Sequence, residues 1–177
     1  MAVDPQPPAS VARITPQDEA ALVARAVAGD RAAFGLLVER YAGVARRVAR
    51  AVLGDPDDAD DAAQDGLLSA LVKLEQYDPR RPFGPWLLRI VANAATDRRR
   101  RRKVRQAEPL DPALAAGGPR PDTVAERRRI AVVLFDVEGY AHAEIAHILG
   151  IPEGTVRSEV FHARRRLRVL LGDWKEQ

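Results

Sequence analysis

Residues 140–168 decide the fold, and they read Tyr140-Ala-His-Ala-Glu-Ile-Ala-His-Ile-Leu-Gly-Ile-Pro-Glu-Gly-Thr-Val-Arg-Ser-Glu-Val-Phe-His-Ala-Arg-Arg-Arg-Leu-Arg168. The spacing of the apolar residues predicts a short helix over about 141–149 and a second helix that starts near Pro152 and runs into a basic tail. Ala146 is small enough to let the two helices approach closely, and Gly150 can take the left-handed conformation at a helix end. These features predict a helix-turn-helix, which sets its second helix in the DNA major groove.

The composition favours helical bundles and excludes several kinds of chemistry. Hydrophobic residues make up 46% of the 177 residues, but aromatic residues only 5%, which is more typical of helical packing than of a sandwich or barrel. The chain has no cysteine, so disulfides, thiolate metal sites and cysteine nucleophiles are excluded. The first ten residues lack an apolar signal core, and the longest apolar run, Ile130–Phe135, is too short to cross a bilayer. We therefore expect a cytoplasmic protein without membrane insertion.

Charge is distributed unevenly along the first half of the chain. Residues 54–78 carry eight carboxylates and one base, Lys73, whereas residues 79–105 carry ten bases and one acid, Asp97. Such a separation fits a protein with two macromolecular partners, one of them a polyanion. The alternative is that these are two solvated helix faces without a partner.

Helical periodicity extends through most of the remaining sequence. Asp30 can cap one helix, and Asp55 followed by Pro56 is a strong helix start. We expect helices at 17–28, 31–53, 57–75, 86 to at least 102, and 123–137, a loop at 77–85, a disordered tail at 1–15 and a Pro- and Gly-rich linker at 106–122. The predicted fold is all-α, with two small helical domains (16–105 and 123–177) joined by a flexible linker.

Two blocks of motifs occur in order along the chain. The first comprises Ala28-Gly-Asp30 with Phe34, Asp58-Ala-Asp-Asp-Ala-Ala-Gln-Asp65, Trp86-Leu-Leu-Arg-Ile-Val-Ala-Asn93 and Asp97-Arg98; the second comprises Glu144-Ile-Ala146, Leu149-Gly-Ile-Pro-Glu-Gly-Thr-Val-Arg-Ser158 and His162-Ala-Arg164. With these blocks the chain resembles an extracytoplasmic-function (ECF) sigma factor of the sigma-70 superfamily. The resemblance covers sigma region two (about 18–105) and sigma region four (123–171).

The resemblance implies that the acidic helix contacts the clamp helices of the largest subunit of core RNA polymerase. The candidate residues are Asp58, Asp61, Gln64 and Asp65. Charge-complementary contacts of this kind speed association and fix register. One alternative is a merely solvated helix face. A calcium loop is a weaker one, because the Asp run lacks the Gly needed at the sharp turn and follows helical periodicity.

The resemblance also implies that the loop 77–85 and the following helix handle the −10 promoter element, with one base of the non-template strand flipped into a pocket. The candidate contacts are Tyr77, Phe83, Asn93, Asp97, Arg98 and Arg99. The two aromatic rings would form the pocket, Asn93 would bond a base edge or a phosphate, and the arginines would hold the backbone. Trp86 is expected in the core, and the run 98–102 cannot share one face because successive helical residues turn by ~100°.

In the second block, the resemblance assigns recognition of the −35 element to the helix that starts near Pro152. The candidate contacts are Thr155, Arg157, Ser158, Phe161, His162 and Arg165. Arg157 could bond a guanine edge and Phe161 could touch a thymine methyl, while Arg165 and its arginine neighbours would contact phosphates. Glu159 departs from the basic residue common at its position and is expected to weaken the attraction for phosphate.

The predicted function is that of a sigma factor that binds core RNA polymerase (clamp helices and flap) and duplex and single-stranded promoter DNA, with an anti-sigma factor as a further partner. A stand-alone helix-turn-helix regulator is the alternative, but residues 18–105 show no βα alternation that would supply a sensor domain. No catalytic residue, metal site or cofactor is expected. His142 and His147 would point ~140° apart on a helix and so could not share a metal.

The start of the second block is shorter than the family pattern. Residues 124–129 run straight into Ile130 where the family has a further helix and a Leu-Pro step, so about a dozen residues are missing. Either the chain is shortened here or the sequence lacks residues that the protein has. An intact mass of 19.4 kDa would rule out the second explanation.

Overall fold

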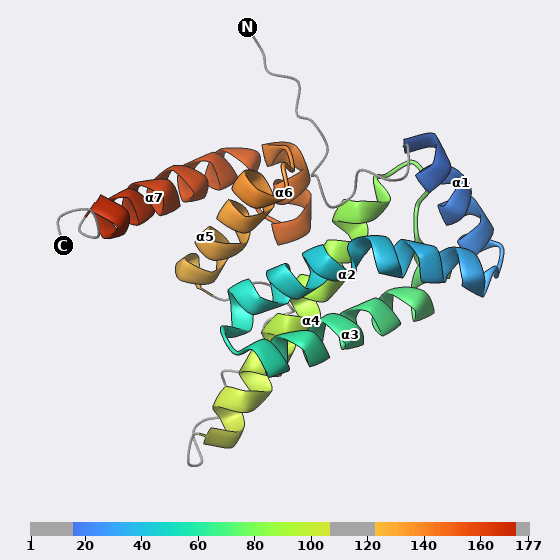
Figure 1. Cartoon of the computed structure of the whole chain (residues 1–177), viewed down its shortest axis with the longest axis horizontal. Helices are drawn as coiled ribbons and strands as arrows, with labels where there is room; N and C mark the ends of the chain where they lie inside the picture. Colours follow the sequence, from blue (N-terminus) through green and yellow to red (C-terminus); the bar gives the residue numbers. More distant parts are fainter. Residues whose placement is uncertain (1–15, 107–122, 173–177) are drawn as a thin grey trace, which may run out of the picture.

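The computed structural model describes residues 16–106 and 123–172, and within these ranges the secondary structure is helical throughout (Figure 1). The elements are α1 (Pro16–Val27), α2 (Arg31–Leu53), α3 (Pro56–Val72), the 3-10 turn η1 (Leu74–Gln76), α4 (Phe83–Gln106), α5 (Val124–Val132), the π-helical turn η3 (Val133–Val137), α6 (His142–Leu149) and α7 (Glu153–Gly172). The all-α prediction is confirmed. The expected tail at 1–15 and nearly all of the expected linker lie outside the described residues.

The helix boundaries follow from local capping. The Asp30 carboxylate accepts hydrogen bonds from the backbone N–H groups of Ala32 and Ala33, at 2.9 and 3.0 Å. The Asp55 carboxylate accepts one from the N–H of Asp58 at 3.0 Å. These bonds satisfy backbone donors that have no partner inside the helix. Both predicted helix starts are therefore confirmed.

Three boundaries differ from the sequence prediction. α4 begins at Phe83, inside the predicted loop 77–85, because Pro85 falls in the first helical turn, where a missing N–H costs nothing. The predicted helix 57–75 ends as an α-helix at Val72 and continues as η1. The predicted helix 123–137 widens into the π-helical turn, where the N–H of Glu138 donates to the carbonyl of Val133, five residues back, at 3.1 Å.

Helices α1 to α4 form a first helical unit. α2, α3 and α4 pack against one another, and α1 lies against α2. The crossing of α3 and α4 is very close at Gly66, where a Cβ atom would lie 2.8 Å from the Cα of Val91. Glycine is therefore required at this crossing because the two backbones leave no room for a side chain.

Helices α5 to α7, with η3, form a second helical unit. Gly150 ends α6 with φ 65°, and the N–H of Ile151 donates to the carbonyl of Ala146 at 3.2 Å. This is the left-handed cap that reverses the chain between the two helices of a helix-turn-helix. The predicted pair of helices is therefore confirmed, with α7 as the second helix.

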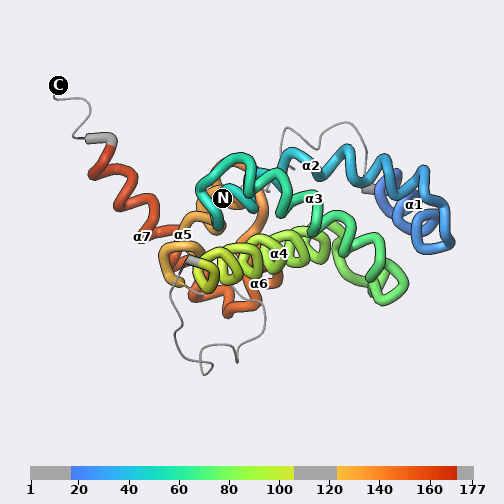
Figure 2. Tube along the Cα trace, turned by 90° about the horizontal axis from the view of Figure 1, so that it is seen from below, coloured from blue at the N-terminus to red at the C-terminus, as the bar shows by residue number. Residues whose placement is uncertain are grey.

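The two units are docked against each other. α5 contacts α2, α6 contacts α4, and one continuous hydrophobic cluster joins residues of both units. Its members from the first unit include Val44, Val48 and Leu88, and those from the second include Ile130 and Leu134. Figure 2 shows α6 alongside α4. This contact was not predicted, because it joins residues that lie far apart in the chain.

We expect Gly66→Ala to lower the free energy of unfolding by about 1–3 kcal/mol, because the added methyl group must push α3 away from the backbone of α4. Urea unfolding of the purified chain measures this. Gly35→Ala in α2 is the matched control, since its Cβ would meet nothing within 4 Å, and there alanine should stabilise by ~0.5–1 kcal/mol through helix propensity. Equal stabilisation by both substitutions would contradict the close crossing.

Candidate polymerase and promoter interfaces

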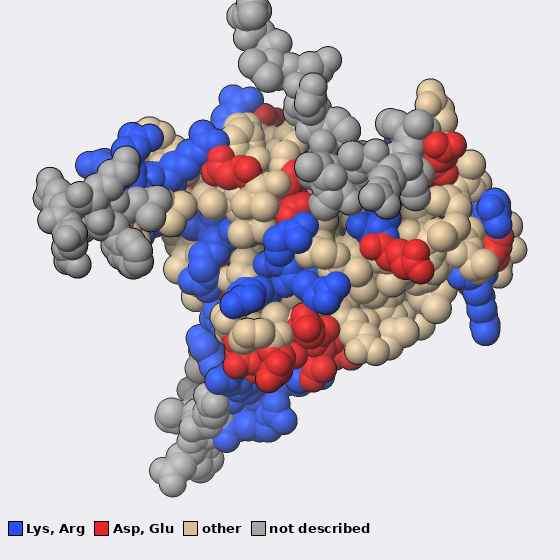
Figure 3. Space-filling view, in the orientation of Figure 1, with Lys and Arg blue, Asp and Glu red and all other residues tan. Residues whose placement is uncertain are grey.

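The acidic face predicted for polymerase binding lies along α3. The side chains of Asp61 and Asp65 are 64% and 66% exposed, and Gln64 is exposed between them. Asp58 is more recessed, with 27% of its side chain exposed. Figure 3 shows carboxylates gathered on this part of the surface next to arginine and lysine side chains. Three of the four predicted residues are thus open to a partner.

The acidic and basic segments do not form two separate faces but meet where α3 packs against α4. Arg98 lies 3.1 Å from the Asp58 carboxylate, 2.7 Å from that of Asp61 and 3.8 Å from that of Asp65. Arg102 reaches Asp58 at 2.8 Å. The hydrogen bond from Arg98 is the main reason that the pKa of Asp58 lies below its usual value, and Arg102 lowers the same pKa further. This carboxylate therefore stays ionised and keeps the two helices paired.

The two aromatic residues predicted for the −10 pocket are buried. Tyr77 and Phe83 are 7% and 2% exposed, and their ring centroids are 5.5 Å apart in an edge-to-face contact. Tyr41 packs on Phe83 from α2 at 5.8 Å, and Trp86 lies 5.1 Å from Tyr77. In this structure the rings fill the space between α1, α2 and α4, so neither Tyr77 nor Phe83 presents an open face to a base.

The side chains of the polar −10 candidates on α4 point in several different directions. Asn93 is half-buried, and Asp97 lies 3.9 Å from Arg100. Arg98 turns to α3, whereas Arg99 turns to the second unit and pairs there with Glu126. The expectation that the arginine run cannot share one face is confirmed, because each step along the helix turns the side chain by ~100°.

The six predicted −35 residues share one side of α7. Their positions span an arc of ~160° at ~100° per residue, and all are exposed except Thr155, which is half-buried. Phe161 is 63% exposed, which is unusual for a ring of this size. Val156 and Val160 on the opposite side are buried in the core. Of the six, Arg157 has a described ion pair, with Glu153 at 2.6 Å.

Glu159 is not the surface acid that the sequence suggested. It is 6% exposed and accepts a hydrogen bond from Arg128 of α5 at 2.6 Å, with Arg127 at 3.8 Å. A carboxylate buried between two guanidinium groups ties α7 to α5. Glu159 was expected to weaken the attraction of phosphate to the side of α7 that carries the −35 candidates, which we call the reading face. That expectation is wrong, because the Glu159 side chain points into the unit and its charge is neutralised there.

Of the three histidines of the second unit, two lie on α6, His142 and His147. The imidazole of His142 stacks on Phe135 with ring centroids 4.3 Å apart. Burial, more than nearby arginines, lowers the pKa of both His142 and His147, which favours their neutral form. In the described part of the chain, no three His, Asp or Glu side chains come together as a metal site.

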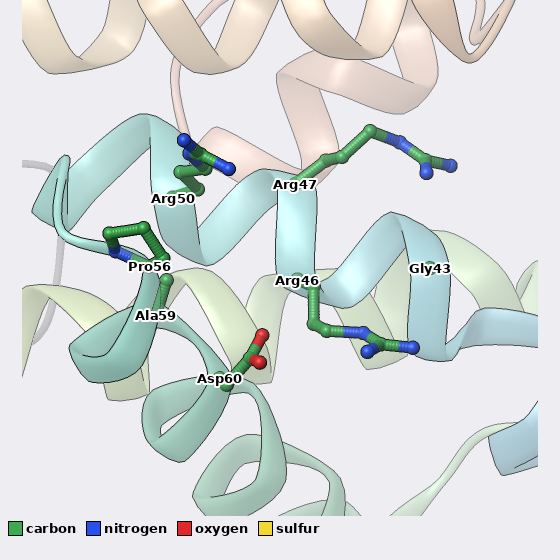
Figure 4. Close-up of a pocket in the computed structure, with 7 residues that line it drawn as sticks. All are labelled: Gly43, Arg46, Arg47, Arg50, Pro56, Ala59 and Asp60. Atoms are coloured by element: carbon green, nitrogen blue, oxygen red, sulfur yellow. The ribbon is translucent and has the colours of Figure 1, made fainter.

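A groove with three arginines, which the sequence analysis did not single out, lies between α2 and α3. Gly43, Arg46, Arg47, Arg50, Pro56, Ala59 and Asp60 line it (Figure 4). Arg47 pairs with Glu138 of the second unit, whereas Arg46 and Arg50 make no ion pair within the described residues. The sequence signal for this groove was the spacing of the three arginines. Arg50 follows Arg46 by four residues and Arg47 by three, and both spacings place side chains next to each other on a helix.

Comparison with known proteins identifies both units. The family model for sigma-70 region 2 matches residues 37–105, within the first unit, and that for sigma-70 region 4 matches residues 122–167, in the second. These matches favour the predicted sigma factor over a stand-alone helix-turn-helix regulator. None of the described helices is long and apolar enough to cross a membrane.

Two curated relatives align over most of the chain. The ECF RNA polymerase sigma factor SigM of Mycobacterium tuberculosis is 39% identical, over 88% of this chain and 86% of its own length. The sigma factor CnrH of Cupriavidus metallidurans is 36% identical, over 89% of this chain and 97% of its own. The SigM alignment extends over 168 residues while covering 88% of 177, so about a dozen aligned positions have no counterpart here.

Solved structures agree with this assignment. The structure of CnrH in complex with the cytosolic domain of CnrY superposes with a TM-score of 0.66 at 29% identity, covering 88% of this chain and 97% of that one. The sigma factor RpoE of Bartonella quintana, in complex with the anti-sigma factor NepR, gives a TM-score of 0.61 at 25% identity, over 78% and 96% of the two chains. This chain therefore belongs to the ECF RNA polymerase sigma factors, the sigma-70 proteins that direct promoter-specific initiation of transcription.

Proposed function

We propose that this sigma factor docks on core RNA polymerase through α3 and reads the promoter at two places, the −10 element with α4 and the −35 element with α7. The observation that carries the proposal is the reading face of α7, where the predicted contacts lie together on the exposed side. Residues 16–105 would act as region two and residues 123–177 as region four. The factor itself catalyses no reaction.

For docking, Asp61, Gln64 and Asp65 present an exposed anionic edge to the clamp helices of the polymerase. Basic side chains of the partner would replace Arg98 as the ion-pair partners of Asp61 and Asp65. Arg98 would keep its ion pair with Asp58, which also stays paired with Arg102. Contacts between exposed charges contribute mainly to association rate and register. Region four would meet the flap of the polymerase.

For the −10 element, Asn93 and Asp97 would face the non-template strand, and Arg98 and Arg99 its phosphates. A flipped base needs an aromatic surface, and stacking on one is worth ~1–3 kcal/mol per base. Tyr77 and Phe83 supply such rings, so the aromatic cluster must open to take the base. Its opening would accompany melting of the duplex.

For the −35 element, α7 enters the major groove with Arg157 and Phe161 at its centre. Arg157 would leave its ion pair with Glu153 and hydrogen-bond to the edge of a guanine base, and Phe161 would contact a thymine methyl group. Ser158 and His162 flank them, and Thr155 and Arg165 would hold phosphates at the two ends of the face.

Two further assignments follow from the family. CnrH and RpoE were each solved with a protein partner, an anti-sigma factor in the case of RpoE, and we propose that an anti-sigma factor masks this chain as well. Because core polymerase and promoter DNA are in the bacterial cytoplasm, the factor would act there. Run-off transcription with purified core polymerase, on promoters selected from a random library, tests the whole proposal. Initiation that does not depend on the added chain would reject it.

We expect the double substitution Asp61→Lys/Asp65→Lys to weaken assembly with core polymerase at least about tenfold, because each exposed attraction becomes a repulsion between like charges. Titration of core polymerase with the labelled factor measures this. Glu75→Lys is the matched control, since Glu75 is exposed in η1 away from the acidic edge. Equal affinity of all three proteins would remove α3 from the docking surface.

We expect Arg157→Ala to reduce discrimination between the selected −35 sequence and one mutated at a single guanine by about 1–3 kcal/mol, roughly 5- to 150-fold. Competitive binding of the holoenzyme to the two duplexes gives the ratio. Arg166→Ala should weaken binding to both duplexes alike, as loss of a phosphate contact does. The assignment fails if Arg157→Ala leaves the ratio unchanged, or if Arg166→Ala changes it equally.

A further inference from the structure

Two carboxylates of the second unit are buried where it meets the first. Glu126 is 0% exposed and pairs with Arg99 of α4; Glu138 is 1% exposed and pairs with Arg47 of α2. An ionised carboxylate is costly to bury unless a cation and hydrogen bonds compensate it. Each of these two carboxylates is therefore stabilised by an arginine that the other unit supplies.

Further contacts join the units between these two ion pairs. The Nε of Arg129 donates to the carbonyl of Ala51 at 2.6 Å. Tyr140 is 8% exposed and sits over Gly84, where a Cβ atom would lie 3.1 Å from its hydroxyl. Together with the shared hydrophobic cluster, these contacts indicate a specific interface between the two units rather than a nonspecific contact.

The interface covers elements that the proposed function assigns to promoter DNA. Arg99 is a proposed phosphate contact, and its guanidinium is occupied by Glu126 with only 17% of the side chain exposed. Gly84 belongs to the segment 77–85 that would form the base pocket, and Tyr140 closes over it. A −10 strand and the second unit would therefore compete for the same side of α4.

We propose that the face of the first unit that reads the −10 element is also the docking surface for the second unit of the same chain, so that the free factor is closed. In the closed state Glu126 pairs with Arg99 in place of a DNA phosphate, and the ion pair of Glu138 with Arg47 stabilises this state. This inference rests on the proposed −10 role of α4. The apparent affinity of the free factor for DNA is lowered by the fraction of molecules that are closed.

The closed state can be loosened without touching the proposed DNA contacts. Arg47→Gln removes the positive charge that the first unit places beside buried Glu138, and a buried carboxylate that loses a cationic partner is destabilised. Its side chain is 40% exposed, so the first unit should tolerate the change. Arg46→Gln is a matched control, because Arg46 is the next residue, is exposed and makes no ion pair within the described residues.

Glu126→Gln loosens the same state from the other side and frees Arg99. It removes the negative charge but keeps the shape of the side chain. Glu39→Gln in α2 is its matched control, since Glu39 is exposed and outside the interface. Thermal unfolding followed by circular dichroism checks that each variant is folded; if Glu126→Gln is not, Arg47→Gln carries the test.

The full chain suits a distance measurement because it has no cysteine. Spin labels at Lys73→Cys and Ala143→Cys, both exposed and one on each unit, report the separation of the units by pulsed electron paramagnetic resonance. Fluorescence anisotropy with a labelled single-stranded DNA of random sequence reports binding. Neither readout needs a promoter or polymerase, so failure here and failure in run-off transcription are distinguishable.

We expect one narrow distance distribution for the parent and both controls, and broader distributions at longer distance for Arg47→Gln and Glu126→Gln. The two opened variants should bind the single strand at least about threefold more tightly than their controls, since the closed fraction no longer lowers the affinity. Unchanged distances in both variants would overturn the closed state. Longer distances with unchanged affinity would overturn the competition with DNA.

Discussion

The pairing of the α4 arginines with carboxylates of two other helices is the interaction on which this structure depends. Arg98 holds the acidic edge of α3, and the next residue, Arg99, holds Glu126 of the second unit. Neighbouring residues on a helix point ~100° apart, so one helix can bridge two partners with adjacent side chains. Because guanidinium groups also bind phosphates, the residues that organise the protein are those proposed to bind DNA.

Local signals made much of the fold predictable. The Asp30 cap, the Asp55-Pro56 start and the left-handed turn at Gly150 each depend on a few adjacent residues, and each is found as expected. Helical periodicity also separates the exposed side of α7 from the buried Val156 and Val160, whereas the choice of −35 contacts on that side came from the family resemblance. Glu159 follows Val156 by three residues, so the same periodicity could have placed it on the buried side.

What the sequence could not show are contacts between residues far apart in the chain. Arg47 and Glu138 are 91 positions apart, and nothing near either residue marks the other as its partner. The burial of Tyr77 and Phe83 was missed for a related reason. Their neighbours include Tyr41 from α2, so whether the rings line an open pocket or fill a core is set by how helices pack, not by the loop sequence.

The small size of the second unit gives the docked arrangement a physical cause. A unit built from α5, α6 and α7 has few apolar side chains to bury among themselves, and small cores are marginal. Ile130 and Leu134 are fully buried in a cluster that includes Val44 and Val48 of α2. The first unit thus supplies apolar packing that these three helices lack among themselves. Opening the interface exposes this apolar surface, at ~25 cal/mol for each Å². A partner that covers the same surface would therefore favour the open state, so polymerase binding and release of the second unit should be coupled.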